Sequence, residues 1–218
     1  MDITIHNTVN EQEVAQDMDA IDILMGEHRL IERVAGALVS FADEARRGGS
    51  DDRGELDRFV TFVREFADAR HHGKEEKILF AAMVEAGFPQ NGGPIAVMLV
   101  EHDQGRSHAR ALAELAASAT PWTAADRDRL AWVSRAWADL LGAHIQKEDR
   151  ILYPMAEQRL PQSILDRVDA DCRAFQAREN ESGEYDRLRR LGEDLAARHV
   201  PSRDVDGPSG PRAGQQCF

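Results

Sequence analysis

The chain has 218 residues and a formal net charge of −12, with 27 basic and 39 acidic residues. This length suffices for one main domain with an extension. A strongly acidic chain repels phosphate backbones and anionic lipid surfaces, so we expect neither nucleic acid nor membrane as a partner. The longest apolar run has seven residues, from Ile78 to Val84, whereas a membrane-spanning helix needs roughly 18.

The opening residues and the cysteines bear on the location of the protein. The opening lacks the basic start, apolar stretch and small-residue cleavage site of a secretory signal. Cys172 and Cys217 lie 45 positions apart, so they form neither a CxxC motif nor a disulfide framework. We therefore expect a cytoplasmic protein whose main chemistry does not depend on thiols.

Helical patterning dominates the sequence. Ala, Leu, Glu and Arg recur at helical spacing, and β-branched runs bounded by turns are missing, which predicts an all-α fold. Pro94 suits the first turn of a helix, and Thr123 can cap one. Short connections predict an up-down-up-down antiparallel four-helix bundle with appended C-terminal helices. The four long helices are predicted over residues 19–46, 54–86, 94–117 and 123–160.

The chain divides into four predicted regions. Apolar residues recur at helical intervals after Pro161, so we expect the segment that follows to pack on the bundle without supplying polar site residues. The last residues are rich in Pro, Gly and polar types, a composition typical of disorder. The regions are an N-terminal lead (1–18), the four-helix bundle (19–160), an appended helical segment (161–199) and a disordered tail (200–218).

An internal repeat is the most informative feature of the sequence. Residues 71–80 read HHGKEEKILF and residues 144–153 read HIQKEDRILY, with five of ten positions identical. A weaker repeat links the stretches around His28 and His102, each of which follows a glutamate. The bundle is therefore interpreted as a helical hairpin used twice. Each copy supplies one His from its first helix and one His-x-x-x-Glu from its second.

The repeated polar residues are predicted to meet inside the bundle. Residues four apart on a helix are separated by about 40° around its axis and about 6 Å along it, so a His-x-x-x-Glu pair faces one place. Each of the four histidines also sits on an apolar stripe. Burying two carboxylates is costly without a cation. The candidate metal ligands are His28, His71, Glu75, His102, His144 and Glu148.

This donor set suits two first-row ions better than one, because both glutamates can bridge them. Imidazole and carboxylate without thiolate admit iron, manganese or zinc, and spacing alone leaves the choice open. A ferritin-like centre would need a Glu-x-x-His pair on two helices, and none occurs in this sequence.

These motifs resemble those of the bacterial hemerythrin-like, or HHE cation-binding, domains. The resemblance covers residues 19–160 and rests on EHRLIE around His28, HHGKEEKILF, GGPIAVMLVEHDQGR around His102, and HIQKEDRILYP. It implies a four-helix bundle whose six candidate ligands hold two iron ions with a bridging oxo or hydroxo group. It also implies a small diatomic or peroxide ligand.

One position departs from the oxygen-carrying hemerythrins, which have a second histidine one turn after that of the third helix. Arg106 stands at that position here. Asp149 stands five residues after His144, as an aspartate does in the carriers, but the duplicated motif favours Glu148 as the ligand. The resemblance therefore predicts two nearly equivalent iron positions and argues against reversible oxygen carriage.

Several neighbouring polar residues have a simpler interpretation than ligation. On an α-helix His72 points about 100° away from the histidine before it, which disfavours ligation; a role as an exchangeable ligand stays open. For Tyr153 we expect core packing, and a role as a redox-active or hydrogen-bonding group stays open. Glu27 and Glu101 fit acceptors behind the ligands and exposed helix positions equally well. The histidines expected on the outer face or in solvent are His108 and His199.

The sequence thus predicts a di-iron-binding protein that senses or reacts with small oxidants, namely oxygen, peroxide or nitric oxide, or that handles iron. Two alternatives stay open: a di-iron enzyme that decomposes peroxide or reduces nitric oxide, and a helical interaction module with a structural metal. Structural sites are normally closed, whereas roughly five donors per ion leave one position open, which favours reactivity. No residue is assigned a catalytic role.

Overall fold

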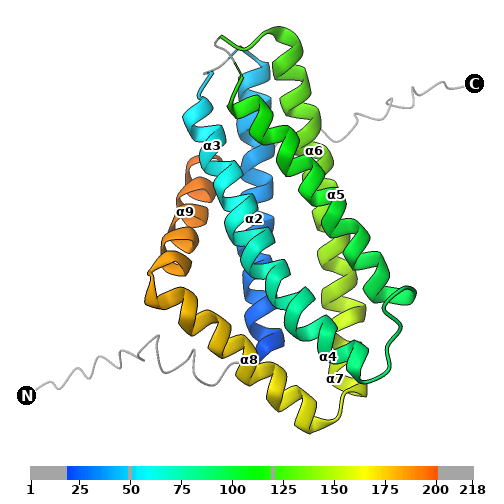
Figure 1. Ribbon diagram of the computed structural model, residues 1–218. Helices are drawn as coiled ribbons and strands as arrows, with labels where there is room; N and C mark the ends of the chain where they lie inside the picture. Colours follow the sequence, from blue (N-terminus) through cyan, green and yellow to red (C-terminus); the bar gives the residue numbers. More distant parts are fainter. Residues whose placement is uncertain (1–18, 49–50, 119–120, 201–218) are drawn as a thin grey trace, which may run out of the picture.

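The computed structural model describes residues 19–48, 51–118 and 121–200. These residues are almost entirely helical and contain no strand, which confirms the all-α prediction for the part of the chain described (Figure 1). The predicted N-terminal lead and all of the predicted tail after Val200 lie outside the described residues. Within the described ranges, no helix combines the length and the apolar character needed to cross a membrane.

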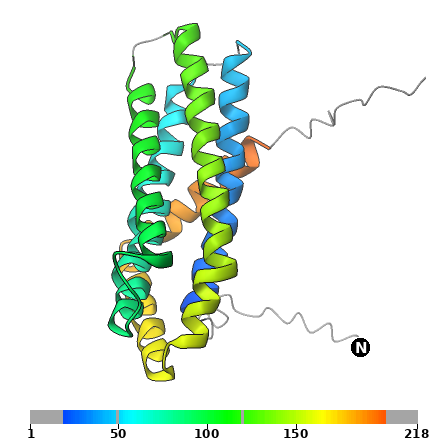
Figure 2. The ribbon, with the colours of Figure 1, turned by 90° about the vertical axis from the view of Figure 1, so that its right-hand side faces the viewer.

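Four long helical segments lie side by side and form the body of the molecule (Figures 1 and 2). Each of their ends lies within one residue of its predicted position. The segments are α2 (Ala20–Arg46); α3 (Arg53–Thr61) with η1 (Phe62–His72), η2 (Glu75–Leu79) and α4 (Phe80–Glu85); α5 (Gly93–Ala116); and α6 (Ala124–Lys147) with η3 (Glu148–Leu152) and α7 (Tyr153–Arg159).

Local capping explains where these segments begin. The Asp19 side chain accepts a hydrogen bond from the backbone N–H of Asp22 at the start of α2. Thr123 and Asp126 form a capping box before α6, and Pro94 lies in the first turn of α5. These residues satisfy or remove N–H groups that a first helical turn leaves unpaired. The predicted roles of Pro94 and Thr123 are confirmed.

Three stretches of the second and fourth segments are π-helical, with backbone hydrogen bonds from residue i to residue i+5. η1 ends at His72, η2 begins at Glu75 and η3 begins at Glu148. η2 (EEKIL) and η3 (EDRIL) occupy equivalent positions of the sequence repeat. The sequence repeat is therefore also a repeat of backbone conformation. Wide π turns often accompany functional sites, and here they coincide with candidate ligands.

The buried apolar side chains form two separate clusters, one on either side of the candidate ligands. Along α2, Leu24 belongs to one cluster and Ile31 to the other, and His28 lies between them. The same order holds along α5, where His102 separates the two clusters. The candidate ligands thus form a polar layer between two apolar layers, a setting in which unpaired charge is costly.

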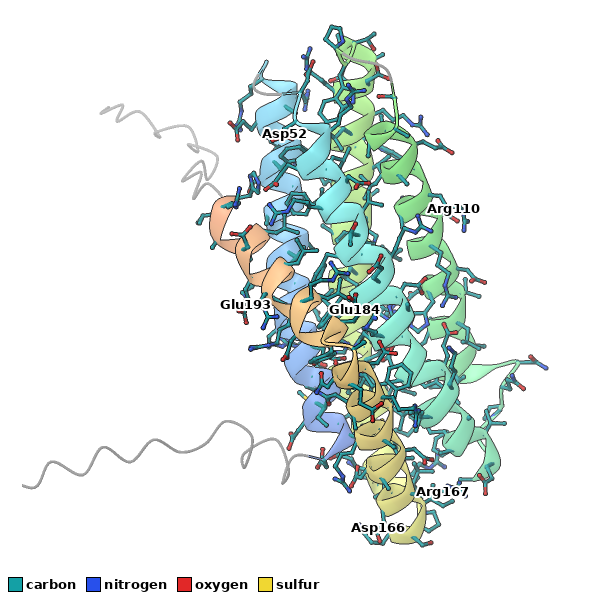
Figure 3. All side chains as sticks on the ribbon, turned by 60° about the vertical axis from the view of Figure 1, so that its left-hand side comes forward. Asp52, Arg110, Asp166, Arg167, Glu184 and Glu193 are labelled. Atoms are coloured by element: carbon teal, nitrogen blue, oxygen red, sulfur yellow. The ribbon has the colours of Figure 1, made fainter. Side chains whose placement is uncertain are left out.

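The appended segment forms two helices along one side of the bundle (Figure 3). They are α8 (Gln162–Glu181) and α9 (Glu184–Arg198), joined at Gly183, whose φ is 72°. α9 packs on α2 and η1, with Leu188 and Leu195 buried in the larger apolar cluster. A Cβ added to Gly192 would overlap the Phe62 ring, so α9 and η1 approach each other closely there.

The prediction that His199 lies in solvent is wrong. Its Nε2 is 2.9 Å from Glu55 Oε1, and its ring packs against the rings of Phe41 and Phe59. Because His199 and Glu55 are 144 residues apart in the chain, helical periodicity gives no sign of their contact.

Candidate metal centre

The structure brings all six predicted ligands together in the buried polar layer. They form two groups, in each of which the ligand atoms lie within 4.8 Å of one another. Glu75 belongs to both groups. We call His28, His71, Glu75 and Glu148 the first group, and His72, Glu75, His102 and His144 the second group.

The Nε2 atoms of the four predicted histidines face the two predicted glutamates. Each glutamate offers its Oε2 atom to one histidine of the first group and to one of the second. This placement suits carboxylates that bridge two ions. The N···O distances are 3.6 Å for His71 and 3.5 Å for His102 from Glu75, and 3.3 Å for His28 and 3.1 Å for His144 from Glu148.

On their outer side the same four histidines each contact a carboxylate through Nδ1. Glu76 and Asp149 take equivalent positions of the repeat in this role. No sequence pattern pointed to Glu76. A carboxylate at Nδ1 orients an imidazole and fixes its tautomer. The pairs are His28 with Asp149 at 2.7 Å, His71 with Glu27 at 2.9 Å, His102 with Glu76 at 2.7 Å and His144 with Glu101 at 2.9 Å.

The hydrogen bonds at Nδ1 determine which nitrogen of each imidazole carries the hydrogen and which is free to bind a metal. An ionised carboxylate only accepts, so each Nδ1 carries a hydrogen, and in the neutral imidazole that binds a metal each Nε2 then keeps its lone pair. The lone pairs face carboxylate oxygens and, for His102 and His144, each other across 3.1 Å. Glu75 Oε2 and both carboxylate oxygens of Glu148 are buried without a hydrogen-bond partner. Facing lone pairs repel unless a cation lies among them, so this donor set fits a metal.

The family model for the hemerythrin HHE cation-binding domain matches residues 19–156. The chain belongs to this family. Neither the curated proteins nor the solved structures gave a significant match. Membership implies that this hemerythrin domain binds metal, with iron as the expected ion, and the buried donor set agrees with it.

Both copies of the hemerythrin repeat place a lysine behind a histidine. Lys74 pairs with Glu27, and Lys147 pairs with Glu101. The Lys74 side chain is 1% exposed, whereas 35% of the Lys147 side chain is exposed. Burial raises the pKa of Glu27, but Lys74 and His71 outweigh it and lower that pKa to about 2. Glu27 and Glu101 therefore act as hydrogen-bond acceptors behind the histidines. The lysines at equivalent positions of the repeat are the sequence feature from which this role could have been predicted.

Tyr153 gives the hemerythrin centre a hydroxyl that has no counterpart in the repeat. Its Oη donates a 2.6 Å hydrogen bond to Glu75 Oε1, and its ring stacks on His28 at 5.6 Å. The equivalent residue, Phe80, stacks on His102 at 6.0 Å. Burial and the charge of Glu75 raise the pKa of Tyr153 well above its usual range, so the hydroxyl keeps its proton. Tyr153 therefore combines the expected core packing with the hydrogen-bonding role that the sequence left open.

His72 belongs to the second group, although α-helical spacing turns it away from His71 and the sequence left its role open. Its ring stacks on the His102 ring at 3.7 Å with an interplanar angle of 14°, and its Nδ1 is 3.3 Å from Asp68 Oδ1. The wide π turn of η1 rotates successive side chains by less than an α turn, so His71 and His72 diverge less than α-helical spacing predicts. The surroundings of the two groups are therefore unequal. The sequence predicted two nearly equivalent metal positions, because Arg106 stands where the oxygen carriers have a further histidine.

Arg106 lies behind the second group and is a member of neither. Its Nε donates to Asp68 Oδ1 at 2.8 Å, and its Nη2 donates to Glu76 Oε1 at 2.7 Å. These two carboxylates contact His72 and His102 respectively. One guanidinium thus holds two histidines in place through their acceptors.

The appended segment supports the centre from outside. Tyr185 of α9 donates a 3.0 Å hydrogen bond to Glu27 Oε1, and Glu27 in turn holds His71. Among the described residues, α8 and α9 supply no member of either group. Their contribution is therefore to the orientation of an acceptor and not to the donor set.

A small cavity of about 20 Å³ borders the second group. Its wall combines polar residues, among them His72 and Arg106, with apolar ones, among them Val63 and Trp137. The cavity has room for about one molecule of the size of water.

Proposed function

We propose that this hemerythrin-family chain is a non-haem di-iron-binding protein that senses or reacts with small oxidants, namely oxygen, peroxide or nitric oxide, or that handles iron. One observation carries the proposal: the lone pairs of four buried imidazoles face two carboxylates that lack hydrogen-bond partners at Glu75 Oε2 and at both oxygens of Glu148. Charge compensation at such a place calls for cations.

In this proposal two iron ions share the polar layer, together with a bridging oxo or hydroxo group. Glu75 and Glu148 would help to hold both ions, since each carboxylate lies near histidines of both groups. The histidines of the first ion are His28 and His71, and those of the second include His102 and His144.

The same proposal includes the chain order of the four helical segments, which we take to be up-down-up-down. It is supported by the short connections between consecutive segments and by the packing of α2 on α6 and of α5 on α6. In this order the second and fourth segments run in the same direction, so their two His-x-x-x-Glu motifs can lie at one level of the bundle.

Iron supplies electrons to a small oxidant by changing between its ferrous and ferric states. The chain's own residues prepare the place for this chemistry. Carboxylates at Nδ1 hold the imidazoles in one tautomer, and the two apolar layers keep bulk water away. The cavity beside the second group admits only a small molecule.

A second candidate function is an enzyme that decomposes peroxide or reduces nitric oxide. It is favoured by Tyr153, whose buried hydroxyl keeps a proton 2.6 Å from Glu75 Oε1. A hydroxyl that keeps its proton at the edge of a water-poor site can donate a hydrogen bond to a strongly basic, reduced oxygen species. The structural-metal alternative has no comparable observation in its favour.

The test is metal analysis of anaerobically purified protein, with ultraviolet-visible spectra before and after air, peroxide and nitric oxide. We expect about two iron atoms per chain, in keeping with two donor groups that share Glu75. The spectra should change with at least one oxidant. One iron per chain in fully loaded protein, or spectra that no oxidant changes, would contradict the proposal.

A further inference from the structure

The second group contains three imidazoles, one more than the first. They come from three elements: His72 from η1, His102 from α5 and His144 from α6. His72 and His102 are stacked at 3.7 Å, and the His72 and His144 rings meet edge-on at 5.9 Å. All three side chains are buried. The extra imidazole therefore lies against the other two and not merely near them.

On its outer side His72 has the same kind of contact as the four predicted ligands, a carboxylate at Nδ1. Its Nδ1 faces a carboxylate, Asp68 Oδ1, at 3.3 Å, so Nε2 keeps the lone pair. Asp68 is itself held by Arg106 Nε at 2.8 Å, and the same guanidinium holds Glu76 behind His102. A carboxylate behind an imidazole is the usual support of a metal-binding histidine.

We propose that His72 is a third histidine ligand of the second metal position. The inference rests on the proposed metal centre and adds a distinction between its two ions. The second ion has three imidazoles, whereas the first has two, His28 and His71, with the Tyr153 hydroxyl beside them. The two ions therefore differ in their donors, although the chain repeat by itself favours two alike.

The extra histidine has no counterpart in the repeat. Its equivalent position is Ile145, a buried aliphatic residue of the larger apolar cluster. An aliphatic residue cannot bind a metal, so the first ion gains no matching donor from the other copy. The difference between the two ions thus originates in one residue, His72, so a single substitution can test it.

The experiment compares the wild type with His72→Ala after loading with ⁵⁷Fe. Mössbauer spectra of the oxidised wild type should contain two different quadrupole doublets of equal area. In His72→Ala they should merge into one doublet, or iron content should fall by about half, since one ion loses a donor. Adding imidazole, which can enter the cavity that the substitution enlarges, should restore the wild-type spectrum.

Two variants serve as matched controls. His108, half-buried against Trp132, is a member of neither group, so His108→Ala should leave the spectrum and iron content unchanged. His144→Ala should lower iron content sharply, because His144 Nε2 faces Glu148 at 3.1 Å. His72→Gln keeps the side-chain volume and replaces the alanine variant if far-ultraviolet circular dichroism shows that His72→Ala does not fold.

The outcomes separate this inference from the proposed function. A single doublet in the wild type, or wild-type doublets in His72→Ala while His144→Ala loses iron, would overturn the role of His72 and leave the metal centre standing. If His144→Ala also kept its iron and spectrum, the metal centre itself would be refuted, and the inference with it.

Discussion

Glu27 on α2 accepts a 2.9 Å hydrogen bond from His71 on η1, although the two residues lie 44 positions apart in the chain. The same carboxylate pairs with the buried ammonium of Lys74 and accepts a hydrogen bond from Tyr185. Glu101 takes the equivalent place behind His144, where it pairs with a partly exposed lysine. Both copies of the repeat thus contain the same arrangement of histidine, glutamate and lysine. The two arrangements differ mainly in how deeply the lysine is buried.

This difference predicts the effects of Glu27→Ala and Glu101→Ala. Glu27→Ala leaves the Lys74 ammonium buried without its partner, so the free energy of unfolding should fall by about 3–5 kcal/mol. Glu101→Ala exposes no buried charge and should cost about 1 kcal/mol or less. Iron affinity should fall by about 10–100-fold in both, because each histidine loses its acceptor. Denaturant unfolding and competition with a chelator measure the two effects; equal losses of stability would contradict the argument from burial.

Tyr153→Phe is predicted to keep its iron and lose stability. The substitution removes the donor to Glu75 Oε1, and a buried acceptor left unpaired costs about 1–3 kcal/mol. The reciprocal variant, Phe80→Tyr, adds a hydroxyl on the His102 side and controls for the change in size. If peroxide decomposition by the iron-loaded protein is unchanged in Tyr153→Phe, the enzyme candidate loses its supporting observation.

Gly192→Ala should loosen the docking of α9. The added methyl group overlaps the Phe62 ring, and overpacking of this kind costs about 1–3 kcal/mol. Gly26→Ala in α2 is the matched control, since an added Cβ there meets nothing within 4 Å. That control should be neutral or stabilising by up to about 1 kcal/mol, as alanine favours a helix. Thermal unfolding of both variants tests the close approach; identical effects would rule it out.

Glu55 predicts a pH dependence of stability. Burial raises the pKa of its carboxyl, but His199 and Arg58 outweigh this and lower it below 4.5. A carboxyl whose pKa is lower in the folded protein stabilises the fold above its unfolded pKa, and this stabilisation disappears as pH falls through the folded value. The stability difference between the wild type and Glu55→Gln should therefore shrink from about pH 4.5 downward.

That difference is measured by denaturant unfolding at pH 7 and pH 4, and any loss of iron at low pH affects both proteins alike. Glu157→Gln, at an exposed position of α7, should show no such trend. A Glu55→Gln difference that stays constant between the two pH values would show that the contact with His199 does not stabilise the fold.

Helical periodicity determined the long helices and the six candidate ligands, because both depend on spacing within one helix. Caps such as Thr123 are also local, and the repeat linked His71 and Glu75 with His144 and Glu148 without any knowledge of packing. Similar depths along their helices were then enough to bring these residues together.

Tertiary structure decided the contacts that join distant positions. The π turns of η1 bring His72 into the second group, where α-helical spacing turns it away. Tyr153 reaches Glu75, and His199 reaches Glu55, only because helices pack in one register. Such partners depend on the relative placement of two helices, and a periodic pattern specifies which face of a helix is buried without specifying what lies opposite.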